Sequence, residues 1–268
     1  MIELKKTVKN FLFDNSPIDS LKEFLDDLGL LTKFSFQFFK TVFRWPFEFA
    51  ELFKQCYLIG YKSVPLLAIT GFIMGLVLTI QSRPTLAEFG AESWLPAMVA
   101  VSIIREIGPV ITGIIFAGKV GSGIGAELAS MKVTEQIDAM DVSGINPFKY
   151  LVVTRVLATT LMLPLLVIFS DAISLYGAYI GVNLKGDVSY SLFVFQVFEK
   201  LHFSDVVPAV IKTFFFGFTV GIVGCYKGYN SNKGTEGVGI ASNQAVVLSS
   251  LTIFIIDMIA VQITSFFE

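Results

Sequence analysis

The fold of this chain is decided by residues 105–140, which read REIGPVITGIIFAGKVGSGIGAELASMKVTEQIDAM. An Arg-Glu pair enters an apolar stretch, a run of glycines follows, and a short segment with acidic residues ends it. The charged pair within so apolar a stretch indicates a polar position inside a membrane-spanning helix. The glycine run predicts a closely packed turn, and the last segment predicts a short helix in water.

The composition extends this interpretation to the whole chain. Of 268 residues 54% are hydrophobic and only 16% are charged, and the mean hydropathy is +0.71. These values exceed those of a soluble domain, so we predict an all-α integral membrane protein. A net charge of -2 excludes a nucleic-acid partner. Cys56 and Cys225 lack the spacing of metal ligands, and His202, as the one histidine, disfavours a hydrolase.

Five apolar stretches are long enough to cross a bilayer, which takes about 20 helical residues. The third is 32 residues long and has Pro164 as its expected kink site. The predicted spans are residues 61–80, 95–118, 150–181, 206–226 and 244–267.

Lysine and arginine counts predict the orientation of these spans. The second and fourth loops with their flanking ends hold six such residues, against three on the opposite side. The richer side is expected in the cytoplasm, which puts the N-terminus inside and the C-terminus outside. The six are Lys119, Lys132, Lys149, Arg155, Lys227 and Lys233, and the three are Arg83, Lys185 and Lys200.

Residues 1–60 form a segment of different character. Between Lys33 and Lys54, aromatic and apolar residues recur at helical spacing with basic residues between them. This pattern predicts an amphipathic helix that lies at the membrane surface, and Pro46 suits the first turn of a second one. A soluble helical hairpin packed on a partner is the alternative.

Glycine pairs spaced four apart recur in or near four of the five spans. In lipid, such pairs allow helix backbones to approach closely, so they favour a tight bundle with a dimer seam. The halves show no internal repeat, which weakens an inverted-repeat secondary transporter. The pairs are Gly71/Gly75, Gly121/Gly125, Gly177/Gly181 and Gly217/Gly221.

Apart from Lys62 and Arg155 near the cytoplasmic ends, five ionisable residues fall within the predicted spans, where an unpaired charge is costly. One interpretation is an internal ion-pair network, with Arg105 or Lys212 paired to Asp257. The other is a water-accessible cavity, open to the outer leaflet, in which these charges meet a lipid headgroup. Both interpretations can be true at the same time. The five are Arg105, Glu106, Asp171, Lys212 and Asp257.

Residues 113–119, GIIFAGK, imitate the spacing of a phosphate-binding loop. Val120 follows where the motif needs a hydroxyl, and the segment continues an apolar helix instead of leaving a strand. The glycine-rich residues 234–239 also lack the lysine and are interpreted as a turn or cap before the last span. We therefore expect no ATP hydrolysis by this chain alone.

The segment after the glycine run predicts a helix over residues 134–142. Thr134 suits its N-cap and Gly144 its C-terminal end. Val133, Ile137 and Met140 share one face, which could insert into a groove of a partner protein. An interfacial helix without a partner is the alternative.

The quoted stretch closely resembles the central signature of MlaE/YrbE-type permeases, the membrane subunits of MCE-associated ABC transporters that move phospholipids and other lipids between membranes. Residues 236–247, EGVGIASNQAVV, resemble a second family block. Lys119 stands where the family commonly has arginine. The resemblance covers roughly residues 61–267.

That resemblance implies a homodimer, in which each chain has an N-terminal interfacial helix, five spans and a cytoplasmic coupling helix. It implies a partner ABC ATPase that binds ATP and Mg²⁺, a hexameric MCE-domain protein and a STAS-domain regulator, with no cofactor in this chain. The expected membrane is the bacterial inner membrane, with the C-terminus in the periplasm, and a plastid inner envelope is the alternative.

Two sets of residues follow by position from the resemblance. The lipid cavity residues are Arg105, Glu106, Lys212 and Asp257, and the ATPase-coupling residues are Thr134, Glu135, Gln136, Ile137, Asp138 and Met140. An ion-coupled secondary transporter of lipids or hydrophobic solutes, with Glu106 and Asp257 as relay groups, is the rival function. A membrane-embedded lipid enzyme is disfavoured, because it would need a base that the lone His202 does not readily supply.

Overall fold

The computed structural model describes residues 17–45, 47–184, 186, 188–231 and 234–266. The chain divides into two compact units, Met1–Trp45 and Pro46–Glu268. The first contains helix α2 (Pro17–Val42), and the second contains all the other helices. Pro46, Lys185 and Lys233, on which predictions above depend, lie outside the described residues.

The predicted surface helix does not run unbroken from Lys33 to Lys54. Helix α2 ends at Val42, residues 43–45 form a turn, and helix α3 begins at Phe49. A proline disfavours helical backbone at the residue before it, which explains a break just ahead of Pro46. The placement of α2 at the membrane surface stays a prediction.

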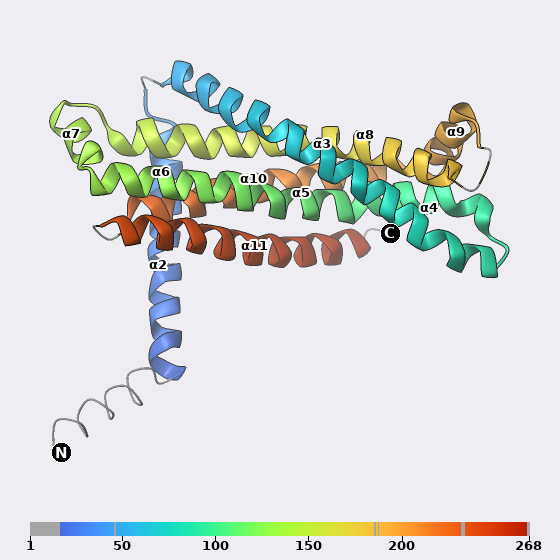
Figure 1. Cartoon of the computed structure of the whole chain (residues 1–268). Helices are drawn as coiled ribbons and strands as arrows, with labels where there is room; N and C mark the ends of the chain where they lie inside the picture. Colours follow the sequence, from blue (N-terminus) through green and yellow to red (C-terminus); the bar gives the residue numbers. More distant parts are fainter. Residues whose placement is uncertain (1–16, 46, 185, 187, 232–233, 267–268) are drawn as a thin grey trace. The chain divides into compact units, whose positions relative to one another are not determined.

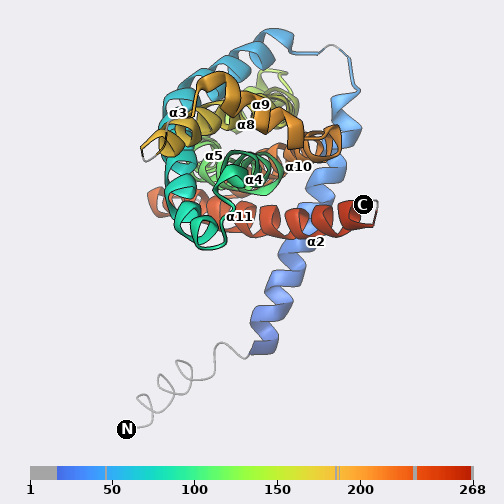
Figure 2. The same ribbon diagram turned by 90° about the vertical axis from the view of Figure 1, so that its right-hand side faces the viewer.

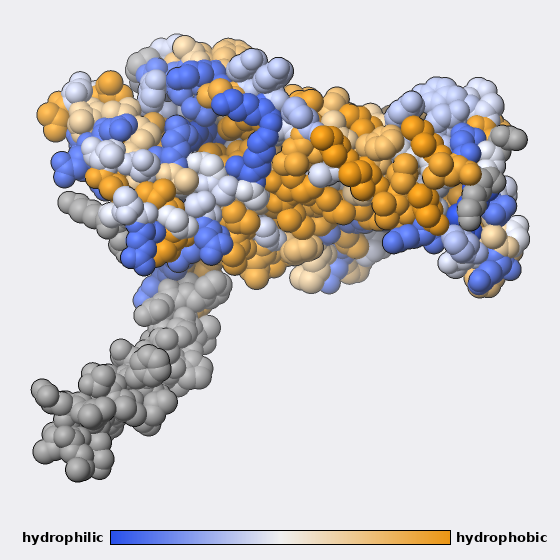
Figure 3. All heavy atoms as spheres, in the orientation of Figure 1, coloured by the Kyte–Doolittle hydropathy of each residue, from blue (hydrophilic) through white to orange (hydrophobic). Residues whose placement is uncertain are grey.

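Five helices of the second unit are long and apolar enough to cross a membrane, counting only the described residues. This number agrees with the prediction, but each helix is longer than its predicted span. The five are α3 (Phe49–Glu88), the segment Glu92–Val133, the segment Phe148–Asn183, α10 (Phe203–Tyr229) and α11 (Thr235–Ser265). Apolar residues cover the middle of the bundle and polar residues gather towards its ends (Figure 3).

Helix α3 begins twelve residues before the first predicted span, at Phe49. Its first two turns hold Glu51, Lys54 and Gln55 among apolar residues, and these polar groups weaken the hydropathy signal without ending the helix. Glu51 is buried and accepts hydrogen bonds from Gln55 at 2.8 Å and from the Tyr150 hydroxyl at 3.1 Å. These bonds satisfy the charge, so the helix extends to Phe49.

The glycine run is helical, contrary to the predicted turn. The second spanning segment comprises η1 (Glu92–Trp94), α4 (Leu95–Ser102), η2 (Ile103–Ile107), α5 (Gly108–Phe116), η3 (Ala117–Gly121) and α6 (Ser122–Val133). A Cβ at Gly121 would lie 3.2 Å from Val220 in α10, and one at Gly125 would lie 3.2 Å from the Ala241 carbonyl in α11. The glycines therefore allow close helix packing.

The other glycine pairs also pack within the chain. A Cβ at Gly75 would overlap the backbone of Ser174 in α8 (Thr154–Asn183), and one at Gly177 would overlap that of Phe72 in α3. Gly217 in α10 meets Thr159 of α8 in the same way. These pairs bind the helices of one bundle together, so they are not available as a dimer seam.

Two further elements complete the second unit. Segment η4 (Phe148–Val153) leads into α8, which continues through Pro164 without a break. Helix α9 (Tyr190–Lys200) was not predicted. Ser189 caps it by accepting a bond from Leu192 at 3.3 Å. Its Phe193 and Val197 pack with α4 and the end of α8, and both views place α9 at this end of the bundle (Figures 1 and 2).

The predicted helix over residues 134–142 is α7 (Gln136–Val142), at the opposite end of the bundle from α9 (Figure 1). Thr134 does not cap it, since its hydroxyl donates to the Ser130 carbonyl at 2.9 Å and so belongs to the end of α6. Glu135 takes a left-handed conformation with φ of 58° between the two helices.

The predicted C-terminal end of α7 is confirmed. Gly144 has φ of +79°, and its backbone N–H donates to the Asp141 carbonyl at 3.0 Å, while that of Ile145 donates to Met140 at 3.0 Å. Glycine suits this left-handed position because it has no Cβ. Residues 235–239 belong to α11, and Gly234 is its N-cap, so the predicted glycine turn is confined to that one residue.

Candidate functional site

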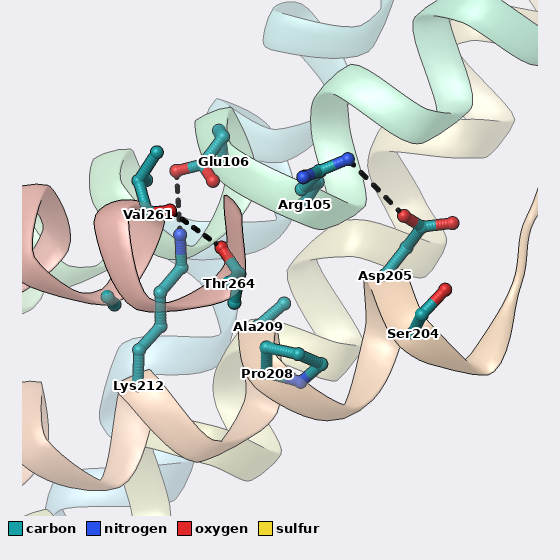
Figure 4. A pocket seen from close by; sticks show the side chains of 10 residues that line it. Arg105, Glu106, Ser204, Asp205, Pro208, Ala209, Lys212, Val261 and Thr264 are labelled. Carbon is teal, nitrogen blue, oxygen red and sulfur yellow. Dashed lines mark hydrogen bonds and ion pairs between the residues drawn. The ribbon is translucent and has the colours of Figure 1, made fainter. Parts of the chain in front are cut away.

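A π-helical segment brings the Arg-Glu pair to the site. In η2 the N–H of Gly108 bonds to the carbonyl of Ile103, five residues earlier. Such wide turns are rare and are frequent at functional positions. Both Arg105 and Glu106 lie within this segment and approach α10 (Figure 4).

Lys212 of α10 forms the centre of an ion-pair network. Its ammonium donates to Glu106 Oε2 at 2.7 Å and to Asp257 Oδ1 of α11 at 2.8 Å. The Lys212 side chain is 5% exposed, against 18% for Asp257 and 36% for Glu106. Three helical segments are thus joined by one buried cation, as the ion-pair interpretation predicted for Lys212 and Asp257.

Arg105 forms its ion pair with Asp205 and not with the predicted Asp257. Its Nη1 lies 3.6 Å from Asp205 Oδ1 at the start of α10 (Figure 4). Asp205 also accepts a bond from the His202 backbone at 3.0 Å, as part of a capping box. Sequence reasoning missed Asp205, because it lies one residue outside the predicted span. Asp205 lies three residues after His202, the residue just before the apolar helix, and an acidic side chain at that position is typical of a capping box. This spacing was the signal available in the sequence.

The space inside this network is small. A pocket of about 20 Å³ lies among η2, α10 and α11, enough for roughly one water molecule. All four predicted cavity residues are therefore close together, but within one chain they do not enclose room for a lipid. The pocket residues include Arg105, Glu106, Ser204, Asp205, Pro208, Ala209, Lys212 and Thr264.

Asp171, the fifth ionisable residue of the spans, lies apart from the network. It lines a larger, mostly apolar groove of about 530 Å³ between α8, α9 and α10. Its Oδ1 is buried and makes no hydrogen bond within the described part of the chain. Lys212 is therefore enclosed by ion pairs, whereas Asp171 borders an apolar groove.

The predicted coupling residues differ in their exposure. Ile137 is only 2% exposed, so it cannot insert into a partner's groove in this structure. Its side chain instead packs inside the chain. Val142, which the sequence argument did not single out, is 91% exposed. Thr134, Glu135, Gln136 and Asp138 are exposed, and Met140 is half-buried.

Ion pairs join α7 to the bundle. Lys132 at the end of α6 donates to Asp138 of α7 at 2.9 Å. Further along α6, Glu127 accepts from Arg155 Nη2 of α8 at 2.8 Å, and the buried Arg155 also bonds to the Leu151 carbonyl at 3.0 Å. These ion pairs connect α7 to α6 and α6 to α8.

Lys119, the departure from the family pattern, lies in η3 and donates to the backbone carbonyl oxygen of Lys62 in α3. A single such bond needs no bidentate guanidinium, so lysine suffices there. Within the described residues, no group of three or more His, Cys, Asp or Glu is placed to hold a metal ion.

Comparison with known proteins identifies the family. The family described as permease MlaE matches residues 52–263. A probable ABC transporter permease protein of Rickettsia typhi is 39% identical over 233 residues, covering 87% of this chain and 90% of that protein. A probable ABC transporter permease protein of Pyropia yezoensis is 36% identical over 213 residues, covering 78% and 80%.

A third relative has a more specific name. The intermembrane phospholipid transport system permease protein MlaE of Haemophilus influenzae is 31% identical over 242 residues, covering 89% of this chain and 93% of that protein. These matches extend over all five spanning helices and the ion-pair network, as the resemblance of residues 105–140 predicted. The chain is a multi-pass membrane protein and belongs to the MlaE family of ABC transporter permeases.

Proposed function

We propose that this chain is the permease of an ATP-driven transporter that moves phospholipid between the membrane in which it is embedded and an MCE-domain partner. The observation that carries this proposal is the similarity along nearly the whole chain to a protein named as an intermembrane phospholipid transport permease. The chain supplies no covalent chemistry. A separate ATPase binds ATP and Mg²⁺, and this chain needs no cofactor.

The lipid path of this proposal forms between two copies of the chain. One copy alone leaves only about 20 Å³ at the predicted cavity residues. Arg105 is 33% exposed and Glu106 is 36% exposed, so the network has an open side. In a homodimer these groups, with Lys212 and Asp257, border the path and meet the lipid headgroup.

The ATPase acts on α7 and the residues just before it. Because Ile137 is buried, the contact is made by the exposed residues of this segment, with Val142 as its apolar member. Motion then passes from α7 to α6 and α8 through the pairs Lys132–Asp138 and Glu127–Arg155. Thr134, Glu135, Gln136, Asp138 and Met140 remain the proposed coupling residues.

The remaining partners follow from the family. An MCE-domain protein, forming a hexameric ring, covers the end of the dimer away from α7, and a STAS-domain regulator binds the ATPase. The proposed location is the bacterial inner membrane, with the N-terminus in the cytoplasm and the C-terminus in the periplasm. A plastid inner envelope is the alternative location.

Purification of the tagged chain from its native membrane tests the assembly. We expect an ATPase with a Walker A motif and an MCE-domain protein to copurify, and mass spectrometry to find bound phospholipid. Val142→Asp should remove the ATPase from the complex, because it places a charge on the exposed apolar contact. Leu184→Asp, at an exposed position beyond the other end of α8, is the matched control and should retain it. Equal recovery of the ATPase with both variants would exclude α7 as its contact.

Reconstitution distinguishes the ion-coupled rival. Vesicles containing the purified complex should move labelled phospholipid to the MCE partner only when ATP and Mg²⁺ are present. Movement by the chain alone, driven by a proton or sodium gradient, would establish the secondary transporter instead. Arg105→Glu should reduce the ATP-driven transfer, because it places a negative charge beside Asp205 and Glu106.

A further inference from the structure

Two lysines come together where the first two spanning segments reach the side predicted to be cytoplasmic. Lys119 of η3 extends to α3, where its ammonium donates to the backbone carbonyl oxygen of Lys62. Lys62 is exposed and Lys119 is half-buried. The bond therefore holds the Lys119 ammonium beside the residue that carries a second cation.

Neither of these charges is neutralised within the described part of the chain, where no carboxylate lies within ion-pair distance of Lys62 or Lys119. A backbone carbonyl positions an ammonium group but carries no full charge, and it uses only one of the three N–H donors. By contrast, Lys54 of the same helix is paired with Glu51 at 3.4 Å. Lys62 and Lys119 thus form a basic pair that can bind an anion.

Stacked tyrosines mark the depth of this basic pair in the membrane. The rings of Tyr57 and Tyr61 are exposed, and their centroids lie 5.3 Å apart with 5° between the ring planes. Tyrosine is enriched at the headgroup level of a bilayer, because its ring is apolar and its hydroxyl is polar. Tyr61 directly precedes Lys62, so the basic pair lies at the level of the lipid headgroups.

An apolar stripe on α3 continues from Lys62 towards the middle of the membrane. We call it the α3 stripe, and it consists of the exposed residues Leu66, Ile69 and Ile73. Spacings of four, three and four residues from Lys62 place all of them on one face of the helix. A phospholipid has the same order of groups, a charged phosphate followed by acyl chains.

We propose that Lys62 and Lys119 bind the phosphate of an anionic phospholipid in the cytoplasmic leaflet, whose acyl chain lies along the α3 stripe. Ammonium groups form charge-assisted hydrogen bonds with phosphate oxygens, and basic sites between spanning helices on the cytoplasmic side suit such headgroups. A zwitterionic headgroup has no net charge to offset two cations, so the anionic lipid is preferred. The site goes beyond the proposed transport path, because it includes no residue of the Lys212 network and needs no ATPase.

Photolabelling of the purified full-length chain in nanodiscs tests the site without any partner. Phosphatidylglycerol and phosphatidylcholine with the same diazirine-bearing acyl chain are compared in a bilayer of unlabelled phosphatidylcholine, and the labelled peptides are identified by mass spectrometry. Phosphatidylglycerol should label the peptide of the α3 stripe about tenfold more than phosphatidylcholine, as two charge-assisted contacts would give.

Variants of the two lysines connect this preference to the site. Lys62→Gln should reduce it while the bond from Lys119 to the backbone persists, since only the Lys62 side chain changes. The double variant with Lys119→Gln should abolish the preference but leave labelling by phosphatidylcholine unchanged. Lys119→Arg should retain the preference, because a guanidinium also binds phosphate.

Lys54→Gln is the matched control. It removes an exposed lysine from the same helix, but one that Glu51 already pairs with, so it should leave the preference unchanged.

Equal labelling of the α3 stripe by the two lipids would overturn the proposal, because the site would then not recognise an anion. A preference that survives the double variant, or that falls as far with Lys54→Gln, would show only a general attraction of anionic lipid to basic residues. None of these results depends on transport or on ATPase binding, so the proposed function and this site fail independently.

Discussion

Lys212 and Asp171 lie in the same bundle and are both almost fully buried, yet their surroundings differ. Lys212 has two carboxylates within 2.8 Å and almost no free space around it. Asp171 Oδ1 has no hydrogen-bond partner in the described part of the chain, and a groove of about 530 Å³ lies beside its side chain. A completed network stabilises the helices that it joins, whereas a buried polar atom without a partner is costly.

This difference leads to opposite expectations for mutation. Loss of a group from the Lys212 network leaves buried charges without a partner, which is destabilising. Neutralisation of Asp171 removes a buried charge whose Oδ1 has no hydrogen-bond partner in the described part of the chain, so it should not lower stability. Four variants test this comparison, and all are measured by thermal or denaturant unfolding of the purified chain in one detergent.

Lys212→Met should have the largest effect, a loss of about 3 kcal/mol in the free energy of unfolding, because Glu106 and Asp257 then face each other without a cation. The triple variant with Glu106→Gln and Asp257→Asn should recover most of this loss. Lys200→Met changes an exposed lysine of α9 and is the control. Equal losses for Lys200→Met and Lys212→Met would show that the network contributes nothing specific.

Gly108→Ala should lower the free energy of unfolding by about 1–3 kcal/mol, because the new Cβ overlaps Asp171 Oδ1 and lies 2.8 Å from the Ile103 carbonyl oxygen. Gly123→Ala, in α6 with no atom within 4 Å, is the control and should be neutral or stabilising. Addition of Asp171→Ala should relieve part of the Gly108→Ala loss. Without such relief, Asp171 would not be packed on α5 as described.

Asp205→Asn should cost about 0.5–1 kcal/mol, a modest value because Arg105 is 33% exposed and lies 3.6 Å away. The asparagine oxygen can still accept the bond from the His202 backbone, so the start of α10 should persist. Glu92→Gln, which weakens the more exposed pair with Arg83, should cost less. A larger loss for Glu92→Gln would contradict the ranking of these two pairs by burial.

Asp171→Asn should have the smallest effect and leave the unfolding free energy unchanged or slightly higher, since a neutral amide is less costly to bury than a carboxylate. Asp257→Asn is the matched comparison, and it should be destabilising because Lys212 loses one of its two anions. If both variants lost the same stability, Asp171 would have a structural partner and the contrast between the two sites would disappear.

The sequence predicted several local features because their causes are local. Apolar runs predicted five spanning helices, and Gly144 marked the end of α7, since only a residue without a Cβ takes that backbone conformation readily. The motif in residues 105–140 predicted the family that the comparisons then showed. The glycine pairs predicted close packing, and each proved to contact a neighbouring helix.

Other features could not be predicted, because they depend on which helices meet. The glycine run looked like a turn, but it is helical. Because glycine has no side chain, α10 and α11 can pack closely against this helix. Ile137 looked like a docking residue but is buried. Helical periodicity places it on the same face of α7 whether that face meets solvent or the rest of the chain, so the sequence could not distinguish the two.

What the sequence by itself determined about this protein is its membrane class, the number of its spans, its family and part of the set of charges inside its bundle. Only the tertiary structure decided that Lys212 joins Glu106 to Asp257, that Arg105 faces Asp205, and that Asp171 lies beside an apolar groove. Helical periodicity places a residue on a face, but the packing of distant helices determines which charges come within bonding distance of each other.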